Sequence, residues 1–406
     1  MKLEEFQIDA LNSCVKCSIC VEYCPVVKVN PAFPGPKQLG LDWLRLSQSE
    51  QLQPDSAVNY CTNCKICEAV CPAGVLPASI NQLTKYHFSK KRIALREFIF
   101  SNPLRLGKLV HIWPKGVNFF MKTGLVKAIM EKLVGISAKA SMPTYSTKSF
   151  SDILKRYEQK LCAEKKIEEI VYFPGCFTEY NRPEVGISLV KIFNKLNYRV
   201  IVPEFMCCGQ PAISNARLQD INKYSKHNVS IIKKYIKEGV PILFTCPSCL
   251  LTIKEEYRNL LDIKEAENYN PFIWDAAQFL LEHDNLTQDL YSLLNKEKKR
   301  SLKMAYHQPC HLKASGLGTP GLSLLNNVAG FKITPLEAGC CGLSGSYGLK
   351  IEKQWISHEI GKNLKNAIDD VNPEALVTEC GMCSVQINHL VKLPVYHPLE
   401  LLAQMI

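Results

Sequence analysis

Eight cysteines near the start of the chain constrain its fold more than any other feature. They form two quartets with the spacing C-x2-C-x2-C-x3-C, each closed by a proline: Cys14, Cys17, Cys20 and Cys24, then Cys61, Cys64, Cys67 and Cys71. Three thiolates at this spacing can converge on one four-iron cluster, whereas in two-cluster ferredoxins the fourth cysteine ligates the other cluster. The pattern predicts two cubane [4Fe–4S] clusters, one held by Cys14, Cys17, Cys20 and Cys71 and the other by Cys61, Cys64, Cys67 and Cys24. Zinc sites and disulfides are the alternatives, but zinc pairs lack the third, evenly spaced cysteine.

Composition places the chain among globular proteins. It has 406 residues, 47% hydrophobic and 21% charged, which is enough for two to four domains. The stretch from Met1 to Ser13 carries acids and lacks an apolar core, so no secretory signal is expected. We therefore expect the nineteen cysteines to be reduced, metal-binding thiols of a cytoplasmic protein. The sequence contains no run of 18 apolar residues, so no transmembrane span is expected.

Four units are predicted: a dicluster domain at 1–90, a basic helical segment at 91–150, and two repeated domains at 151–292 and 293–406. In the first unit we expect short helices around the clusters. The linking stretch 30–37 contains three prolines and a glycine, which predicts turns instead of a helix.

The basic segment carries most of the chain's net charge of +11. From Lys90 to Lys139 the sequence has eleven Lys or Arg residues and only two acidic residues, a surplus of nine positive charges. Helices are expected at 104–113 and 117–134, but their lysines fall on different sides and form no clean polar stripe. A contact with an anionic membrane surface and a docking face for a partner protein both fit this segment. Nucleic-acid binding is not expected, because no nucleic-acid-binding fold accompanies the charge.

The remaining residues contain an internal repeat of five cysteines. Equivalent cysteines are offset by 133 or 134 residues: Cys176, Cys207, Cys208, Cys246 and Cys249 in the first copy, and Cys310, Cys340, Cys341, Cys380 and Cys383 in the second. In both copies apolar runs alternate with helical patterns, with strands expected at 170–173, 200–202, 242–244, 304–306, 331–333 and 375–377, and helices at 185–196 and 221–236. This alternation predicts βαβ units with a parallel sheet. The fold class is therefore α/β in the C-terminal half, behind a mainly α-helical dicluster domain.

In such a sheet the five cysteines of each copy gather at the carboxyl edge of the strands. The adjacent thiolates of Cys-Cys-Gly can ligate two irons of a larger cluster, and the glycine allows a close approach of the backbone. Zinc at the C-x2-C pairs, or a metal-free redox dithiol, are the alternatives. The pattern is that of the cysteine-rich CCG domain and resembles the catalytic subunit of heterodisulfide reductase. That resemblance implies one non-cubane [4Fe–4S] cluster in each copy.

Two histidines, His307 and His311, flank Cys310 in the second copy only. They are candidate proton donors to a reduced quinone, or they hydrogen-bond cluster sulfurs. His397 is expected to be structural and Cys162 to be an ordinary thiol. The G-x-G-x-x-G match at 316–321 lacks the strand-to-helix context of a dinucleotide site.

Several longer stretches, beyond the cluster motifs, resemble the C subunit family of anaerobic glycerol-3-phosphate dehydrogenases, and the resemblance runs nearly end to end. They are Phe33-Pro34-Gly35-Pro36-Lys37-Gln38, Tyr60 to Lys65, His307 to His311, Cys340 to Gly348, and His397-Pro398-Leu399. The resemblance implies an electron-transfer subunit of anaerobic respiration and glycerol metabolism that is not itself catalytic toward glycerol 3-phosphate. Its implied partners are an FAD-containing catalytic subunit, a second flavoprotein subunit and a menaquinone-type quinone, at the cytoplasmic side of the inner membrane. The iron–sulfur subunit of glycolate or lactate oxidase and a heterodisulfide-reductase-like disulfide reductase are the alternatives.

Overall fold

The computed structural model describes residues 9, 12–49, 53–89, 95–164, 166–261, 263–283, 285–295, 297 and 301–406. Most of the stretch 1–13, where no leader was expected, falls outside these residues. The predicted domain boundary at 90/91 also falls outside them. So do three of the eleven cations of the basic segment, at positions 90–92.

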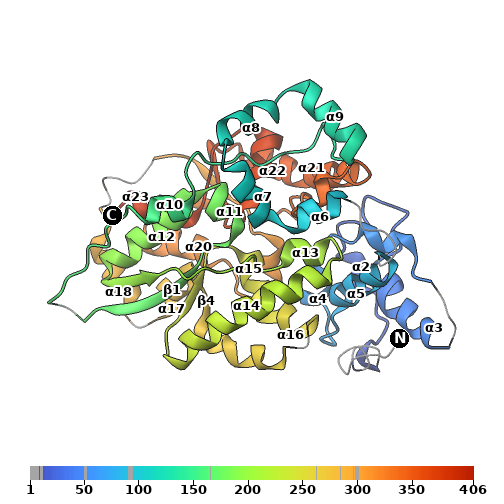
Figure 1. Ribbon diagram of the computed structural model, residues 1–406, viewed down its shortest axis with the longest axis horizontal. Helices are drawn as coiled ribbons and strands as arrows, with labels where there is room; N and C mark the ends of the chain where they lie inside the picture. The colour runs from blue at the N-terminus through green and yellow to red at the C-terminus, as the bar shows by residue number, and fades with distance from the viewer. Residues whose placement is uncertain are drawn as a thin grey trace.

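The cysteine quartets lie in a domain of short helices, drawn in blue in Figure 1. Its helical segments are α2 (Ile19–Glu22), η1 (Lys37–Asp42), α3 (Trp43–Ser49), η2 (Ser56–Tyr60), α4 (Ile66–Ala69) and α5 (Pro77–Ser89). The proline-rich stretch forms turns up to Gly35, as predicted, and η1 begins two residues later. Phe33 and Val26 are buried in one cluster with Cys24 and Cys61, so the turns form part of the domain core.

The basic segment folds as a series of short helices that cross the top of the molecule (Figure 1). They are α6 (Leu95–Ser101), α7 (Pro103–Val110), α8 (Pro114–Phe120), α9 (Gly124–Val134) and α10 (Phe150–Leu154). The prediction of one continuous helix at 117–134 is wrong. Thr123 adopts an extended conformation with ψ 137°, and its hydroxyl donates to the Phe120 carbonyl at 2.8 Å, so the chain turns between α8 and α9.

Each repeated domain contains a four-stranded parallel sheet, as the alternation predicts. The first has the order β2-β1-β3-β4, with β1 (Glu168–Phe173), β2 (Tyr198–Ile201), β3 (Ile242–Phe244) and β4 (Ile273–Asp275). The second has the equivalent order β6-β5-β7-β8, with β5 (Met304–Tyr306), β6 (Ile333–Pro335), β7 (Ala375–Val377) and β8 (Val395–Tyr396). The pair Tyr172–Leu243 in the first sheet recurs as Tyr306–Val377 in the second.

Helices cover both sheets. In the first domain they are α11 (Gly175–Tyr180), α12 (Pro183–Lys195), α13 (Gln210–Ser214), α14 (Leu218–Lys237), α15 (Pro247–Leu251), η3 (Thr252–Glu256), α16 (Tyr257–Asn259), η4 (Lys264–Phe272), α17 (Ala276–Glu282) and α18 (Leu286–Leu293). In the second they are α19 (Cys310–Ala314), α20 (Pro320–Ser323), η6 (Leu324–Val328), η7 (Tyr347–Leu349), α21 (Gln354–Val371), α22 (Gly381–Val391) and α23 (Pro398–Gln404).

The sheets differ from the prediction in two details. The strand expected at 331–333 begins at Ile333, because Phe331 still closes the turn after η6, with its N–H donating to the Leu325 carbonyl at 2.9 Å. The short edge strands β4 and β8 were not predicted.

The two repeated domains share one apolar core. It includes Leu189 of α12, Leu243 of β3, Leu324 of η6 and Leu402 of α23, all fully buried. Arg182 strengthens this contact through an ion pair with Glu400 at 2.5 Å. A shared core fixes the relative position of the two five-cysteine sets.

Candidate iron–sulfur sites

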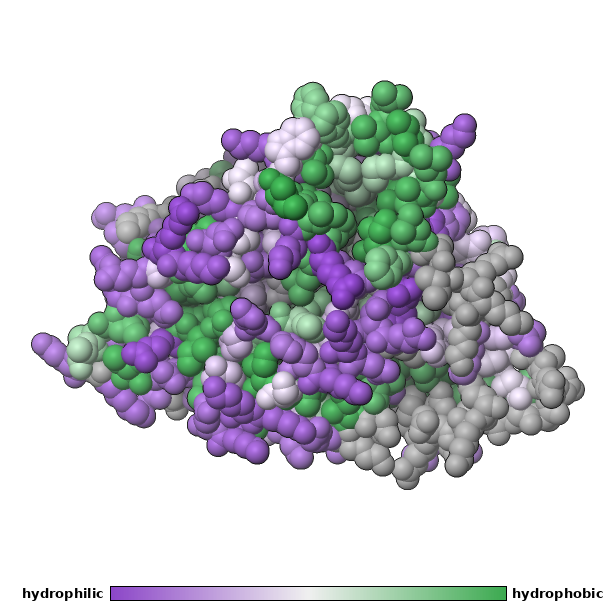
Figure 2. All heavy atoms as spheres, viewed as in Figure 1, coloured by the Kyte–Doolittle hydropathy of each residue, from purple (hydrophilic) through white to green (hydrophobic). Residues whose placement is uncertain are grey.

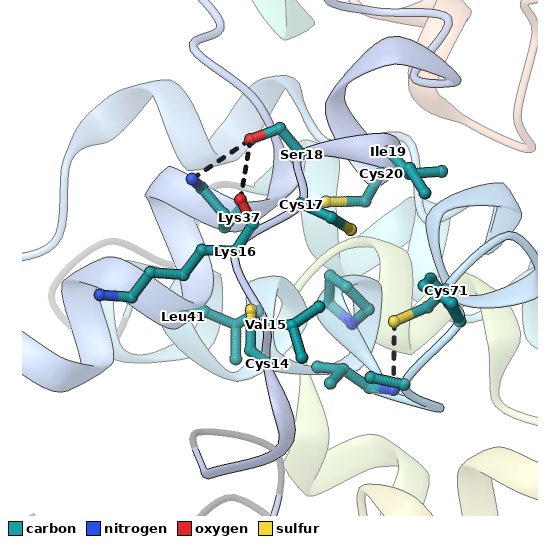
Figure 3. Close-up of a pocket in the computed structure, with 14 residues that line it drawn as sticks. Cys14, Val15, Lys16, Cys17, Ser18, Ile19, Cys20, Lys37, Leu41 and Cys71 are labelled. Atoms are coloured by element: carbon teal, nitrogen blue, oxygen red, sulfur yellow. Dashed lines mark hydrogen bonds between the residues drawn. The ribbon is translucent and has the colours of Figure 1, made fainter.

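The first site lies at the surface of the dicluster domain. Cys14, Cys17, Cys20 and Cys71 line one cavity, and their sulfur atoms turn toward it (Figure 3). Cys17 is exposed and the other three are partly buried. The Val75 N–H donates to the Cys71 sulfur at 3.3 Å (Figure 3).

The second site lies deeper in the same domain. Cys24, Cys61, Cys64 and Cys67 line a second cavity, and all four are buried. The buried Gln82 amide donates to the Cys61 sulfur at 3.6 Å. Cys24 and Cys71 therefore each lie beside the first three cysteines of the other quartet, the arrangement that the crossed ligand assignment requires.

The same backbone conformation shapes both cysteine loops. Lys16 and Ser18 have φ of 59° and 65°, and Asn63 and Lys65, at the equivalent positions of the second quartet, have 56° and 63°. Such left-handed values are uncommon outside glycine. Their recurrence shows that both loops wrap in the same way and turn three cysteines toward one centre.

The third site is formed by the first repeated domain. Cys176 follows β1, Cys207 and Cys208 lie beyond β2, and Cys246 and Cys249 follow β3. Their side chains make a connected set, in which Cys207 contacts Cys176 and Cys208, and Cys249 contacts Cys208 and Cys246. The parallel sheet thus brings all five thiols together.

The fourth site has the same plan in the second domain, with one addition. Cys340 contacts Cys310 and Cys341, and Cys383 contacts Cys341 and Cys380. A ring nitrogen of His307 and the sulfurs of Cys341 and Cys383 all lie within 4.8 Å of one another. Both His307 ring nitrogens are buried without a hydrogen-bond partner, and the equivalent residue of the third site is Phe173.

His311 lies where three of the sites meet. Its Nδ1 is 2.8 Å from the Ser248 hydroxyl, in the C-x2-C loop of the third site. Its Nε2 is 2.8 Å from the Asn63 carbonyl, in the cysteine loop of the second site. Because a carbonyl only accepts, Nε2–H is the donor there, and a neutral ring accepts at Nδ1 from the serine. Neither nitrogen is left for a quinone, so this geometry favours a positioning role over proton donation.

The thiols connect the sites in a definite order. Cys20 of the first site and Cys24 of the second are close enough to interact electrostatically. Cys64 of the second site interacts in the same way with Cys340 and Cys310 of the fourth. Through Ser248 and His311, the third site adjoins the same junction. The four thiol sites therefore form a series that begins at the exposed Cys17 and continues inward to both repeated domains.

A buried ion triad joins the second site to the first repeated domain. The Lys65 ammonium lies 3.1 Å from Glu68 and 2.5 Å from Glu256 of η3, and all three side chains are at least nine-tenths buried. Burial lowers the pKa of Lys65, but Glu256 and Glu68 outweigh burial and hold that pKa above its ordinary value. Breaking such a pair leaves an uncompensated buried charge, at a cost of about 3–5 kcal/mol.

Apart from the four cysteine sites, the exposed apolar surface of the basic segment is a candidate binding surface. It is formed by Leu109, Ile112, Trp113, Phe119, Phe120, Leu125, Ile129 and Leu133, which we call the apolar ridge. Figure 2 shows a broad green area over α8 and α9. Ile112, Leu125 and Leu133 are 74–80% exposed, whereas large apolar side chains in such a cluster are normally covered. No helix in the described part of the chain is long and apolar enough to cross a membrane.

The donor sets fit iron–sulfur clusters. All nineteen cysteines are free, and eighteen of them gather into two groups of four and two of five. Soft thiolate donors in such numbers suit iron–sulfur clusters. Burial raises the pKa of Cys24 to about 11 and raises that of Cys67 well above its ordinary value, so thiolates there need the positive charge of a metal. Cys162, the remaining cysteine, is exposed and apart from the sites, and His397 caps α23, as expected for an ordinary thiol and a structural histidine.

Comparison with known families agrees with this assignment. Residues 10–75 match the 4Fe-4S dicluster domain, and residues 170–254 and 304–388 each match the Cysteine-rich domain called CCG. The fold and the four thiol sites define an iron–sulfur electron-transfer subunit.

A full-length relative narrows this class. The C subunit of Anaerobic glycerol-3-phosphate dehydrogenase from Escherichia coli (strain K12) is 32% identical over 405 residues, which are 97% of this chain and 98% of the relative. The chain belongs to this family, the C subunits of anaerobic glycerol-3-phosphate dehydrogenase.

Less similar relatives also cover most of this chain. The B subunit of Fumarate reductase (CoM/CoB) from Methanothermobacter marburgensis is 24% identical, over 95% of this chain and 70% of its own length. The D subunit of Dihydromethanophenazine:CoB–CoM heterodisulfide reductase from Methanosarcina barkeri is 25% identical, over 94% of this chain and 89% of its own length.

Sequence reasoning missed several residues of these sites. Ser248 and Asn63 lie between the cysteines of their motifs, at positions that the cysteine spacing leaves unspecified, and Glu256 lies in η3, outside any motif. No local signal distinguishes them, because their role depends on contacts between distant parts of the chain.

Proposed function

We propose that the chain carries electrons from a flavin-containing dehydrogenase that oxidises sn-glycerol 3-phosphate to a menaquinone-type quinone in the membrane. In this proposal the FAD-containing catalytic subunit and a second flavoprotein subunit form a complex with the chain. One observation carries the proposal: the thiol sites follow one another from the surface at Cys17, through Cys24 and Cys64, to Cys340 in the second repeated domain. When bound, the clusters accept and release single electrons, and the protein holds them at fixed positions.

Family membership supports the substrate, since the 32% identical relative is named for glycerol-3-phosphate dehydrogenation. The apolar ridge supports the membrane. Lys108, Lys115, Lys122 and Lys132 beside it are exposed, and this mixture of apolar and cationic side chains suits an anionic lipid surface. We propose that the chain binds peripherally at the cytoplasmic side of the inner membrane.

The test uses the chain purified anaerobically together with the flavoprotein subunits. We expect the clusters to be reduced on addition of sn-glycerol 3-phosphate, and not on addition of glycolate or lactate. Reduction by glycolate or lactate alone would assign the chain to the corresponding oxidase. Reduced clusters that are reoxidised by a disulfide but not by a quinone would favour the disulfide reductase.

A first prediction concerns cluster content. If all four sites fill, the chain should contain about sixteen irons with matching sulfide, four at each site. Chemical analysis of anaerobically purified protein measures both. Eight irons together with stoichiometric zinc would show that the repeated domains are zinc modules, and eight irons without zinc would show dithiols.

A second prediction concerns His311. Its removal in His311→Ala leaves the Asn63 carbonyl and the Ser248 hydroxyl without this partner, and each lost hydrogen bond costs about 1 kcal/mol. We expect the free energy of unfolding to fall by about 2 kcal/mol and quinone reduction to slow, with iron content unchanged. Anaerobic denaturant titration and quinol formation measure the two effects.

The variant His311→Gln separates positioning from proton donation. A glutamine amide can keep one of the two hydrogen bonds but cannot deliver a proton as an imidazole does. Partial recovery of the rate in His311→Gln supports positioning. A rate as low as that of His311→Ala, with stability restored, would support proton donation instead.

A further inference from the structure

Three buried lysines lie close enough together to interact electrostatically, and one of them, Lys85, also lies near Cys61 of the second site. They are Lys85 of α5, Lys350 and Lys353, each only 4% exposed. Lysine is almost never fully buried unless a negative charge accompanies it. Their burial in one place therefore requires an explanation.

The protein partners of these lysines are mostly neutral. The Lys85 ammonium donates to the Ser214 carbonyl at 2.7 Å, and the Lys353 ammonium donates to the Asn59 carbonyl at 2.6 Å. Lys350 pairs with Glu97 at 3.1 Å, but Glu97 also pairs with Arg96. Among the described residues, four cations here, Arg96 included, face only Glu97 and Glu352, which leaves a surplus of two positive charges.

Lys65, which also lines the second site, differs from these three lysines because its buried charge is neutralised by carboxylates. Lys65 has two carboxylate partners within 3.1 Å. At Lys85, burial and the nearby Lys350 lower the pKa to about 8, and the partial compensation comes from Cys61 and Glu97. Burial and then Lys85 and Lys350 lower the pKa of Lys353 as well, and Glu352 compensates this only in part. Of the three lysines, Lys85 lies close enough to Cys61 of the second site for the two groups to interact.

Tyr347 connects the lysines to the thiols. Its ring lies 5.0 Å from the Lys353 ammonium and packs in one buried cluster with Cys24, Cys61 and Cys340. Cys24 and Cys61 belong to the second site, and Cys340 to the fourth. Tyr347 therefore links Lys353 to both the second and the fourth site. Among the described residues that line the first cavity no lysine is buried in this way: Lys16 is exposed, and Lys37, which is 16% exposed, lies 3.9 Å from Asp42.

We propose that Lys85, Lys350 and Lys353 are the built-in counter-charge of the second cubane cluster and raise its reduction potential. The inference rests on the proposed iron–sulfur function of that site. A four-iron core with four thiolates is an anion, and uptake of one electron from the neighbouring cubane adds one more negative charge. The positive charge of the ammonium groups stabilises the added negative charge. Buried cations act strongly here, since little water screens them.

The test is a redox titration of the full chain with dithionite as reductant, followed by electron paramagnetic resonance. The second cubane is identified as the signal that Cys64→Ala alters. We expect Lys85→Met and Lys353→Met each to shift its midpoint to more negative potential, and the double variant to shift it further. The first cubane should titrate as in the wild type. Lys362→Met, an exposed lysine on α21, is the matched control and should change nothing.

The charge-retaining variant Lys85→Arg guards against misfolding. If Lys85→Met loses the second cluster and Lys85→Arg keeps it, a positive charge at this position is required, as proposed. Loss in both variants would show that packing, not charge, matters at this position and would overturn the proposal. An unchanged midpoint with full iron content in the methionine variants would also overturn it. In that case four intact signals in the wild type would still support the proposed electron-transfer function.

Discussion

Replacement of Cys24 by serine is expected to alter or remove the second cluster and to leave the first intact, although Cys24 belongs to the first quartet. Cys24 lines the cavity that also contains Cys61, Cys64 and Cys67. It is 9% exposed and packs against Val26 and Phe33 in the domain core. A serine alkoxide is a poor iron ligand beside thiolates, so iron content should fall from about sixteen to about twelve if the cluster is lost.

The reciprocal variant makes this prediction sharp. Cys71→Ser removes a thiol of the second quartet but should affect only the first cluster, because Cys71 lines the cavity of Cys14, Cys17 and Cys20 (Figure 3). Cys162→Ser is the control, since Cys162 is exposed and lies outside all four sites. Electron paramagnetic resonance of the reduced variants separates the two signals. Loss of only the Cys14-side signal in Cys24→Ser would contradict the crossed assignment.

The stability of the two variants should also differ. The second site is buried, and its cysteines form part of the core that contacts Tyr347 and Ile356 of the second repeated domain. The first site is near the surface and packs mainly on Leu41 and Val75. Because metal binding contributes directly to folding in small metal domains, Cys24→Ser should destabilise the chain more than Cys71→Ser does.

The repeat and its sheets could be predicted from sequence because their signals are local. Five cysteines kept in register over 133 or 134 residues require the same domain twice, and the apolar runs at 170–173 and 304–306 identify equivalent strands. The structure confirms this equivalence in the pairing of β1 with β3 and of β5 with β7. The edge strands β4 and β8 were not predicted, because β4 ends in Asp275 and β8 has only two residues, so neither forms the apolar run that marks the predicted strands.

The junction between the sites could not be predicted, because its contacts join distant segments. His311 reaches Asn63 across 248 positions of sequence, and Lys353 reaches Asn59 across 294. Buried lysines are also indistinguishable from surface lysines in a sequence. These lysines are buried where the dicluster domain packs against both repeated domains, and no local sequence pattern encodes that contact.

The lysines of the basic segment form no clean polar stripe on a single helical wheel. A helical wheel over 117–134 assumes one helix, but the turn at Met121–Thr123 changes the direction of the chain between α8 and α9. The apolar ridge therefore gathers side chains from three short helices, and no single helix has to carry a complete apolar stripe.

Changes in and beside the apolar ridge should also have a large effect, in this case on membrane binding. We expect the purified chain to float with anionic liposomes and to bind neutral liposomes more weakly. Each Lys or Arg near an anionic leaflet contributes about 1 kcal/mol, and salt weakens this attraction. Changing Lys115, Lys122, Lys127, Lys132 and Lys139 to Glu should therefore cost on the order of 5 kcal/mol at low salt, enough to abolish flotation.

A matched control distinguishes a local site from net charge. Lys223, Lys226, Lys234 and Lys237 of α14, together with Lys332, are exposed and lie away from the apolar ridge, and their change to Glu alters the net charge by the same amount. Flotation should survive in this control. Equal loss in both sets would show that only the overall charge of the chain matters.

Apolar insertion should account for the binding that remains at high salt. Full burial of a large apolar side chain contributes about 1.5–3 kcal/mol, so Ile112→Asn, Phe119→Asn, Leu125→Asn and Leu133→Asn together should remove salt-resistant binding. These side chains are largely exposed, so the fold should tolerate the changes, and an unaltered thermal unfolding curve checks that it does. Unchanged flotation of both the Glu and the Asn variants, together with loss of binding to the flavoprotein subunits, would show that the apolar ridge is an interface with those subunits instead of a membrane contact.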